Sequence, residues 1–132
     1  PKYAVCWFNL GKALFRVGDL NKALVAFQTS TDLNPNNRSA WNNRGVTLRQ
    51  LNRLEESLDC YQRALDLKKD YAWAWHNKGY ALELFDRPRE ALESYTTALK
   101  HKPSSVEHGG AVWDKLKKDT EDAIGRLKKI FK

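Results

Sequence analysis

The sequence has few of the residues that usually support chemistry. Its 132 residues include no methionine, two cysteines and three histidines. Cys6 and Cys60 form no Cys-x-x-Cys pair, and no histidine stands at metal-ligand spacing from either of them. The motifs of phosphate-binding loops, zinc proteases and serine hydrolases are also missing. We therefore expect no enzymatic activity and no cofactor. The two cysteines are predicted to be reduced and partly buried thiols, which are typical of a cytoplasmic protein.

The sequence also lacks long apolar runs. Hydrophobic residues make up 42% of the chain and charged residues 30%, and no stretch approaches the roughly 20 apolar residues that a membrane-spanning helix needs. The net charge is +7, which would attract acidic peptides, nucleic acid or anionic lipid. The net charge alone does not distinguish among these three classes of partner.

One motif, in contrast, occurs three times in the sequence. The stretches CWFNLGKAL, AWNNRGVTL and AWHNKGYAL occupy residues 6–14, 40–48 and 74–82. Their tryptophans, asparagines, glycines and final leucines each recur every 34 residues. A strict period of this length indicates a repeat architecture.

Each period predicts a pair of helices. In the first period, apolar residues from Val5 to Phe15 follow a helical spacing, Gly18 and Asp19 interrupt it, and a second apolar face runs on to Phe27. The turn residues at 34–37 then close the unit. The predicted units are residues 4–37, 38–71 and 72–105.

These units resemble tetratricopeptide (TPR) repeats, whose pattern is Trp-x2-Leu-Gly-x2-Tyr, then Ala-x3-Phe, then Pro. The residues in the motif positions are Trp7, Leu10, Gly11, Ala23, Phe27 and Pro35 in the first unit, Trp41, Gly45, Ser57 and Tyr61 in the second, and Trp75, Gly79, Ala91, Tyr95 and Pro103 in the third. Leucine replaces the pattern tyrosine in each unit, and Lys69 replaces one proline. The resemblance implies an all-α fold, an α-solenoid of three TPR helix–turn–helix repeats.

Both ends of the chain depart from the period. Pro1 lies 34 residues before Pro35, so residues 1–3 are interpreted as the remnant of a preceding repeat in a longer array. Residues 106–132 are predicted to form a linker and an amphipathic helix, because apolar residues recur there at alternating spacings of three and four. This seam consists of Trp113, Leu116, Thr120, Ala123, Leu127 and Ile130. The resemblance implies that the helix caps the array; a role in partner binding stays open, and acidic residues on the helix disfavour membrane attachment.

The resemblance also implies a binding groove, because the first helices of TPR repeats line the concave face. A helical wheel places the groove candidates opposite the Trp–Gly–Leu face of each first helix and on its flanks. The predicted groove residues are Asn9, Lys12, Arg16, Asn42, Asn43, Arg49, Trp73, His76, Asn77 and Tyr80. The asparagine repeated at positions 9, 43 and 77 could pair with the backbone of an extended peptide or bond a neighbouring helix. The apolar residues of the third unit indicate either a ligand pocket or a surface that the next helix covers.

The charges along this face predict the character of the partner. Basic residues lie in the first unit and aromatic residues in the third, so we expect a protein or peptide with acidic residues at one end and an aromatic or apolar anchor at the other. Some TPR grooves clamp a terminal carboxylate, but Phe8 stands where such a clamp has its first lysine. We therefore predict a non-enzymatic interaction module or scaffold without claiming that clamp.

Two alternative functions remain. An RNA-binding helical-repeat array would explain the positive charge, but such arrays read bases with varied polar side chains in each repeat, so the repeated asparagine makes nucleic acid the weaker prediction. A structural role is the second alternative, in which copies form a homo-oligomer through the ends of the array.

Overall fold

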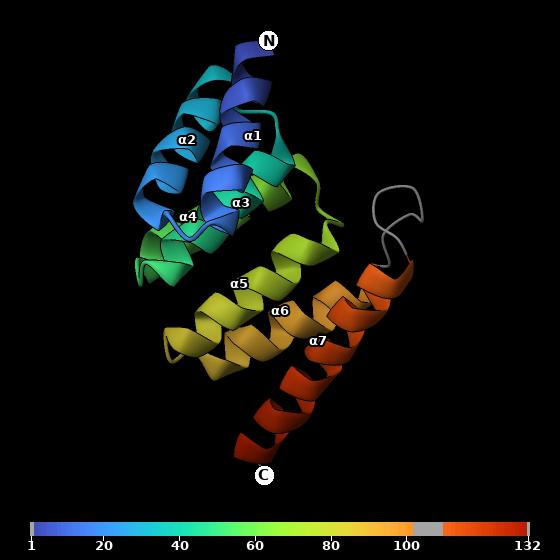
Figure 1. The fold of residues 1–132 in the computed structure, drawn as a ribbon. Coiled ribbons are helices and arrows are strands. Elements are labelled where there is room, and N and C mark those ends of the chain that lie inside the picture. The colour runs from blue at the N-terminus through green and yellow to red at the C-terminus, as the bar shows by residue number, and fades with distance from the viewer. Residues whose placement is uncertain (1, 102–109, 132) are drawn as a thin grey trace. The chain divides into compact units, whose positions relative to one another are not determined.

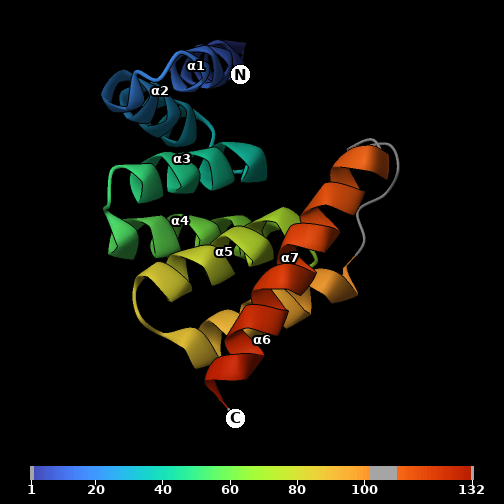
Figure 2. The same cartoon turned by 60° about the horizontal axis from the view of Figure 1, so that its bottom comes forward.

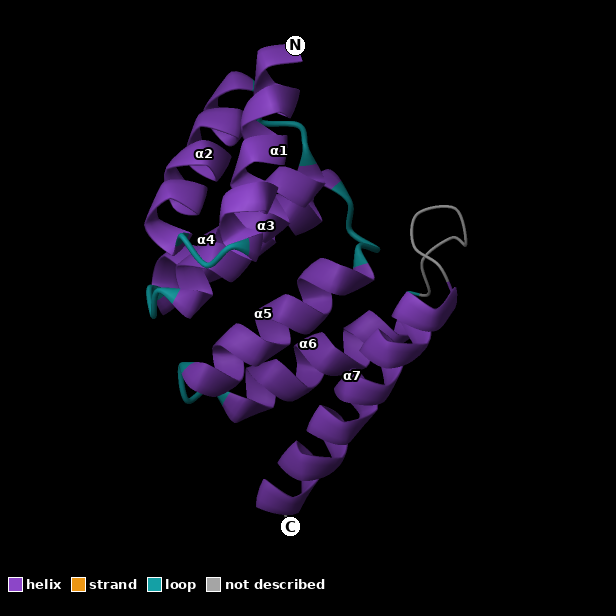
Figure 3. Ribbon diagram, in the orientation of Figure 1, coloured by secondary structure: helices purple, strands orange, loops and turns teal. Residues whose placement is uncertain are grey.

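The structure is a computed structural model that describes residues 2–101 and 110–131. These ranges hold seven helices and no strand, which confirms the predicted all-α class (Figures 1 and 3). The helices are α1 (Lys2–Arg16), α2 (Leu20–Leu33), α3 (Arg38–Gln50), α4 (Leu54–Leu67), α5 (Ala72–Leu84), α6 (Pro88–Lys100) and α7 (Gly110–Ile130). The chain divides into two compact units, Pro1–Lys69 and Asp70–Lys132, and each is described by itself.

The turn inside each helix pair has the same backbone conformation. Gly18, Asn52 and Asp86 stand 34 residues apart and have φ angles of 88°, 62° and 59°. Glycine adopts this left-handed region freely, and asparagine and aspartate tolerate it better than other residues. The three turns therefore reverse the chain in the same way although only one of them uses glycine.

A glycine and an aromatic ring close each helix pair. An added Cβ would lie 2.7 Å from Phe27 at Gly11, 2.6 Å from Tyr61 at Gly45 and 2.8 Å from Tyr95 at Gly79. Any larger residue would have to displace a ring that is almost fully buried. The pairs α1–α2, α3–α4 and α5–α6 thus have the close helix contact that the TPR pattern predicts.

Unit 1 stacks two of these hairpins, as Figure 2 shows for α1–α2 and α3–α4. Trp41 is buried at the junction, where its indole Nε1 donates to the carbonyl of Pro35 at 2.8 Å. The guanidinium of Arg44 lies 5.1 Å from the Trp41 ring centroid and donates to Thr31 Oγ1 at 2.9 Å. Trp7, the equivalent residue of the first repeat, is 37% exposed. The tryptophan position is therefore a core position where a preceding helix covers it.

Unit 2 consists of the α5–α6 hairpin and α7, which packs mainly on α6 (Figure 1). Trp113 and Leu116 form a buried cluster with Ala72 at the start of α5. The buried side of α7 continues through residues 120, 123 and 127, as predicted. Ile130 was expected to extend this seam, but it is 61% exposed. The next residue, Phe131, contacts the hairpin instead, with the Arg89 guanidinium of α6 4.8 Å from its ring centroid. The helix covers the hairpin in the way expected of a cap.

No helix in residues 2–101 and 110–131 is long and apolar enough to cross a membrane.

Candidate functional site

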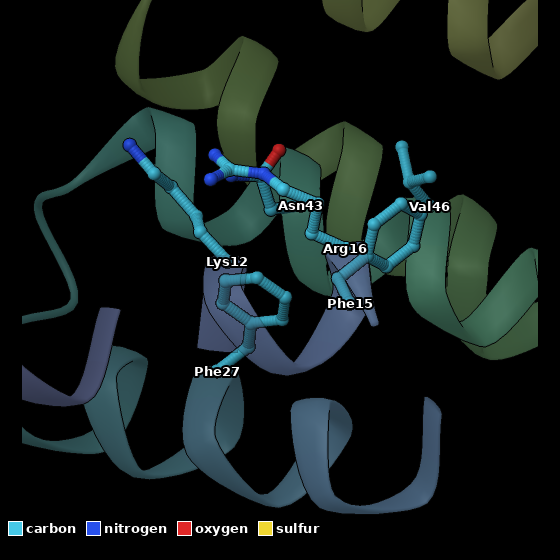
Figure 4. A pocket seen from close by; sticks show the side chains of 6 residues that line it. All are labelled: Lys12, Phe15, Arg16, Phe27, Asn43 and Val46. Atoms are coloured by element: carbon cyan, nitrogen blue, oxygen red, sulfur yellow. The ribbon is translucent and has the colours of Figure 1, made fainter. Parts of the chain in front are cut away.

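A pocket of about 450 Å³ lies in unit 1 along α1 and α3 (Figure 4). The lining residues are Lys12, Phe15 and Arg16 from α1, Phe27 from α2, and Asn43 and Val46 from α3. Three of the ten predicted groove residues, at positions 12, 16 and 43, therefore meet at one place. The first two repeats build this pocket together.

The floor of the pocket is held in place by close aromatic packing. Phe27 is 1% exposed and lies against Gly11 of α1. Its ring centroid is 6.1 Å from that of Phe8, with the two rings tilted by 55°. Phe15 is half-buried beside this floor. A ligand group that enters the pocket would meet an aromatic surface that is already formed.

The rim of the pocket is positively charged. Lys12 and Arg16 are exposed and lie one helical turn apart on α1. The ammonium of Lys12 lies 5.0 Å from the centroid of the Phe8 ring, a cation–π distance that restrains the side chain near the pocket. The lining residues include two cations, one amide and no acid. This combination suits a carboxylate that is attached to an apolar group.

The other predicted residues of unit 1 do not line this pocket. Asn9 is exposed on α1, whereas Asn42 is only 7% exposed and belongs to the packing of α3. Arg49 is half-buried and lies near the hydroxyl of Tyr61. Burial raises the pKa of Tyr61 to about 12, and the positive charge of Arg49 counteracts part of this rise. Asn42 and Arg49 thus lie in packed surroundings rather than on an open surface.

In unit 2, α7 covers part of the predicted groove face. Trp73 packs against the cluster that Trp113 and Leu116 form with the start of α5. His76 Nδ1 lies 2.8 Å from Thr120 Oγ1. The Thr120 hydroxyl donates to the Leu116 carbonyl, so it accepts from the imidazole. Of the two interpretations of the third-unit stripe, coverage by the next helix therefore applies to Trp73.

The remaining two predicted residues of α5 are less covered. Tyr80 is 44% exposed, and Asn77 is half-buried. The repeated asparagine thus has different surroundings in the three repeats: it is exposed at position 9, lines the pocket at position 43 and is half-buried at position 77.

A polar network joins all three helices of unit 2 at Glu83. Its carboxylate accepts from the Tyr95 hydroxyl at 2.6 Å and from Arg126 Nη2 at 2.7 and 2.9 Å. Burial, together with the hydrogen bond to Glu83, raises the pKa of Tyr95. The same hydrogen bond raises the pKa of Arg126, which keeps the guanidinium charged at neutral pH. The network fastens α7 to the hairpin.

The described residues give little support to catalysis. No group of three or more His, Cys, Asp or Glu side chains among them could hold a metal ion. Cys60 is buried, and burial raises its pKa to about 11, so it is a poor nucleophile at neutral pH. The sequence predicts that both thiols are partly buried. In the structure Cys6 is exposed, so the prediction is wrong for this residue.

Sequence reasoning left three lining residues out of the predicted site. These are Phe15 and Val46, which are not among the predicted groove residues, and Phe27, which was predicted as a TPR motif residue. One feature of the sequence points to them: the first repeat has phenylalanine at positions 15 and 27, where the third repeat has Glu83 and Tyr95. The apolar character of the first repeat at these positions is what forms the pocket floor.

Comparison with known proteins agrees with this architecture. Family models match residues 4–37, described as a tetratricopeptide repeat, residues 47–84, described as a TPR repeat, and residues 74–105, described as a tetratricopeptide repeat. A search of curated proteins gave no match.

Solved TPR structures share the fold. The first TPR of Spaghetti (RPAP3), determined with an HSP90 peptide SRMEEVD, is 18% identical, with a TM-score of 0.83 over 98% of this chain and 94% of its own. The Arabidopsis OM64 TPR domain is 22% identical, with a TM-score of 0.83 over 97% and 96%. The TPR domain of P58(IPK) is 23% identical, with a TM-score of 0.81 over 96% of this chain and 33% of its own.

At these sequence identities the solved structures support the fold alone. The assignment to a family depends on the sequence matches. Two of the matching models, on residues 4–37 and 74–105, follow the 34-residue units that the Trp–Gly–Leu spacing defines, and the third, on residues 47–84, spans parts of the second and third units. The glycine–aromatic contacts explain why that spacing is kept. The chain belongs to the tetratricopeptide repeat family.

Proposed function

We propose that this chain is a non-enzymatic protein-interaction module that binds a peptide segment of a partner protein along its first helices. The observation that carries the proposal is the pocket in unit 1, which combines a rim of Lys12 and Arg16 with a floor of Phe15 and Phe27. The first and second TPRs of Spaghetti, both determined with the HSP90 peptide SRMEEVD, support it by similarity of fold. That peptide carries two glutamates and an aspartate beside apolar residues.

The proposed ligand has acidic residues together with a large apolar or aromatic side chain. Burial of the apolar group supplies most of the affinity, because a few buried anchors dominate such contacts. The charges mainly set orientation and association rate, and their effect fades with salt. The proposed site of action is the cytoplasm.

The repeated asparagine has a proposed role in holding the peptide backbone. Asn43 lines the pocket and Asn9 is exposed on the neighbouring first helix. An amide side chain both donates and accepts, so it pairs with a peptide group whatever the ligand sequence. Replacing Asn9, Asn43 and Asn77 together by alanine should weaken peptide binding by roughly 0.5–1.5 kcal/mol for each hydrogen bond lost. Helicity in far-UV circular dichroism should be nearly unchanged.

Titration of fluorescent peptides at two salt concentrations tests the proposal. The probes are an acidic peptide with an apolar residue, such as SRMEEVD, and the same peptide with its acids replaced by lysine. The acidic peptide should bind more tightly, with an advantage that shrinks at high salt. Equal binding of the basic peptide at low salt, or tighter binding of a single-stranded RNA than of either peptide, would overturn the proposal in favour of the RNA-binding alternative.

A further inference from the structure

From the pocket in unit 1 we infer that recognition is confined to the first two repeats, and that the pocket takes a carboxylate and an apolar side chain that are neighbours in the ligand. The inference rests on the proposed function and narrows it. It differs from the sequence-based expectation, which placed the acidic and apolar ends of the ligand at opposite ends of the array.

The pocket residues of unit 1 have equivalents in unit 2. Along α5 and α6, the residues 68 positions after four of the pocket residues are Tyr80 for Lys12, Glu83 for Phe15, Leu84 for Arg16 and Tyr95 for Phe27. In each unit, a further helix packs on the second helix of the hairpin and touches the first: α3 does so in unit 1, and α7 does so in unit 2. The helices α1, α2 and α3 around the pocket therefore correspond to α5, α6 and α7 in unit 2.

In unit 2 the chain places one of its own side chains at the equivalent position. Arg126 of α7 reaches the carboxylate of Glu83, which also accepts from Tyr95. Two turns earlier on α5, His76 is bonded to Thr120. The charged end of a side chain is thus accommodated at the position that corresponds to the pocket, and it is paired with a group of opposite sign.

In unit 1 the same positions have the opposite character. Phe15 and Phe27 replace the acid and the phenol, so the floor carries no charge. Positive charge appears instead at Lys12 and Arg16, and the pocket of about 450 Å³ remains open. A ligand that fits this pocket must carry a negative charge at the rim and an apolar group at the floor. Its charge is opposite to that of Arg126, which pairs with Glu83 in unit 2.

The dimensions require the two ligand groups to be close together. Lys12 and Arg16 are roughly 6 Å apart along the helix axis, and Phe15 lies between them in the sequence. Successive residues of an extended peptide advance by roughly 3.3 Å. The carboxylate and the apolar side chain therefore lie within two residues of each other. Nothing in this arrangement distinguishes a side-chain carboxylate from a terminal one, and the experiment compares both.

Substitutions in both units test the inference on the full 132-residue chain. Peptides with an acid next to leucine, with a free or an amidated C-terminus, are titrated by fluorescence polarisation. Phe15→Glu should weaken binding of the acidic peptides at least tenfold at both low and high salt. Lys12→Glu with Arg16→Glu should weaken it at least tenfold at low salt only. Tyr80→Ala and Leu84→Ala, the matched changes in unit 2, should alter affinity less than twofold.

A gain of binding guards against loss through misfolding. The triple variant Lys12→Glu, Phe15→Glu, Arg16→Glu should prefer the lysine-substituted peptide by at least tenfold while its circular dichroism matches the parent. An equal loss from Tyr80→Ala and from Phe15→Glu would overturn the confinement to two repeats and leave peptide binding intact. The absence of binding of any peptide to the parent chain at millimolar concentration would instead overturn the proposed function itself.

Discussion

Arg126 and Glu83 are 43 residues apart in the chain, yet the guanidinium Nη2 of Arg126 lies 2.7 Å from a carboxylate oxygen of Glu83. The Glu83 side chain is 19% exposed, and it also accepts from Tyr95. A half-buried acid of this kind needs partners, because desolvation disfavours its charge. The pair therefore links α7 to the hairpin more specifically than the apolar seam does alone.

We expect Arg126→Ala to lower the free energy of unfolding by about 1 kcal/mol, a modest loss because Arg126 is 59% exposed. Urea denaturation followed by far-UV circular dichroism measures the change. Lys117→Ala, an exposed residue of the same helix, is the matched control and should shift stability by less than about 0.5 kcal/mol. Equal effects of the two changes would mean that the pair contributes nothing beyond general helix charge.

The fold was predictable because the signals for it are local and repeated. The 34-residue spacing places Gly45 and Tyr61 at fixed positions, where the two helices approach so closely that a Cβ added at Gly45 would lie 2.6 Å from the Tyr61 ring. The seam of α7 was predictable from its spacing up to Leu127. The exposure of Ile130 was not, because it depends on which side of the last turn of α7 faces the hairpin, where Phe131 rather than Ile130 contacts Arg89.

The candidate site was predictable only in part. The helical wheel found Lys12, Arg16 and Asn43, because direction on a helix follows from sequence position. It could not show that Asn42 would be buried or that α7 would cover Trp73, because both depend on contacts between helices that are distant in sequence. The side of the helix on which a residue lies was therefore easier to predict than whether that residue is exposed.

Gly45→Ala should destabilise the chain by about 1–3 kcal/mol. The new Cβ would lie 2.6 Å from a buried ring carbon of Tyr61, so ring or helix must move. Gly125→Ala is the control, because nothing lies within 4 Å of the added methyl and alanine favours the helix. We expect it to raise stability by about 0.5–1 kcal/mol. Thermal and urea unfolding report both, and a neutral Gly45→Ala would contradict the close helix contact.

Trp41→Ala should cost about 3–5 kcal/mol, because it removes a large buried side chain and the hydrogen bond to Pro35 at the junction of two hairpins. Trp7→Ala makes the same change at the equivalent position of the first repeat, where the side chain is 37% exposed. It should cost less than half as much. Urea denaturation of both variants shows how much of the loss of stability comes from burial rather than from the Trp→Ala change itself. Equal losses would show that the two tryptophans are buried to the same extent in solution.

The thiols should differ in reactivity towards a disulfide reagent at neutral pH. Cys6 is exposed and should react within seconds to minutes, whereas Cys60 is 3% exposed and should react only as the chain unfolds. Variants with either cysteine replaced by alanine assign the fast and slow phases. Rapid reaction of both thiols in the folded protein would contradict the burial of Cys60.

Cys60 also predicts how stability depends on alkaline pH. Burial raises its pKa from 9.0 to about 11, so above pH 9 the unfolded chain releases a proton that the folded chain keeps. The unfolded state then binds fewer protons, and the free energy of unfolding falls as pH rises from 9 to 11. A shift of this size corresponds to roughly 2–3 kcal/mol. Urea denaturation at several pH values should show that Cys60→Ala reduces the loss between pH 9 and 10, whereas Cys6→Ala retains it in full. A further loss, which begins below pH 10 and grows towards pH 12, should remain in both variants, because burial also raises the pKa of Tyr61 to about 12 and, with the hydrogen bond to Glu83, raises the pKa of Tyr95. A flat profile for the parent chain from pH 9 to 11 would show that the thiol is solvated in the folded state.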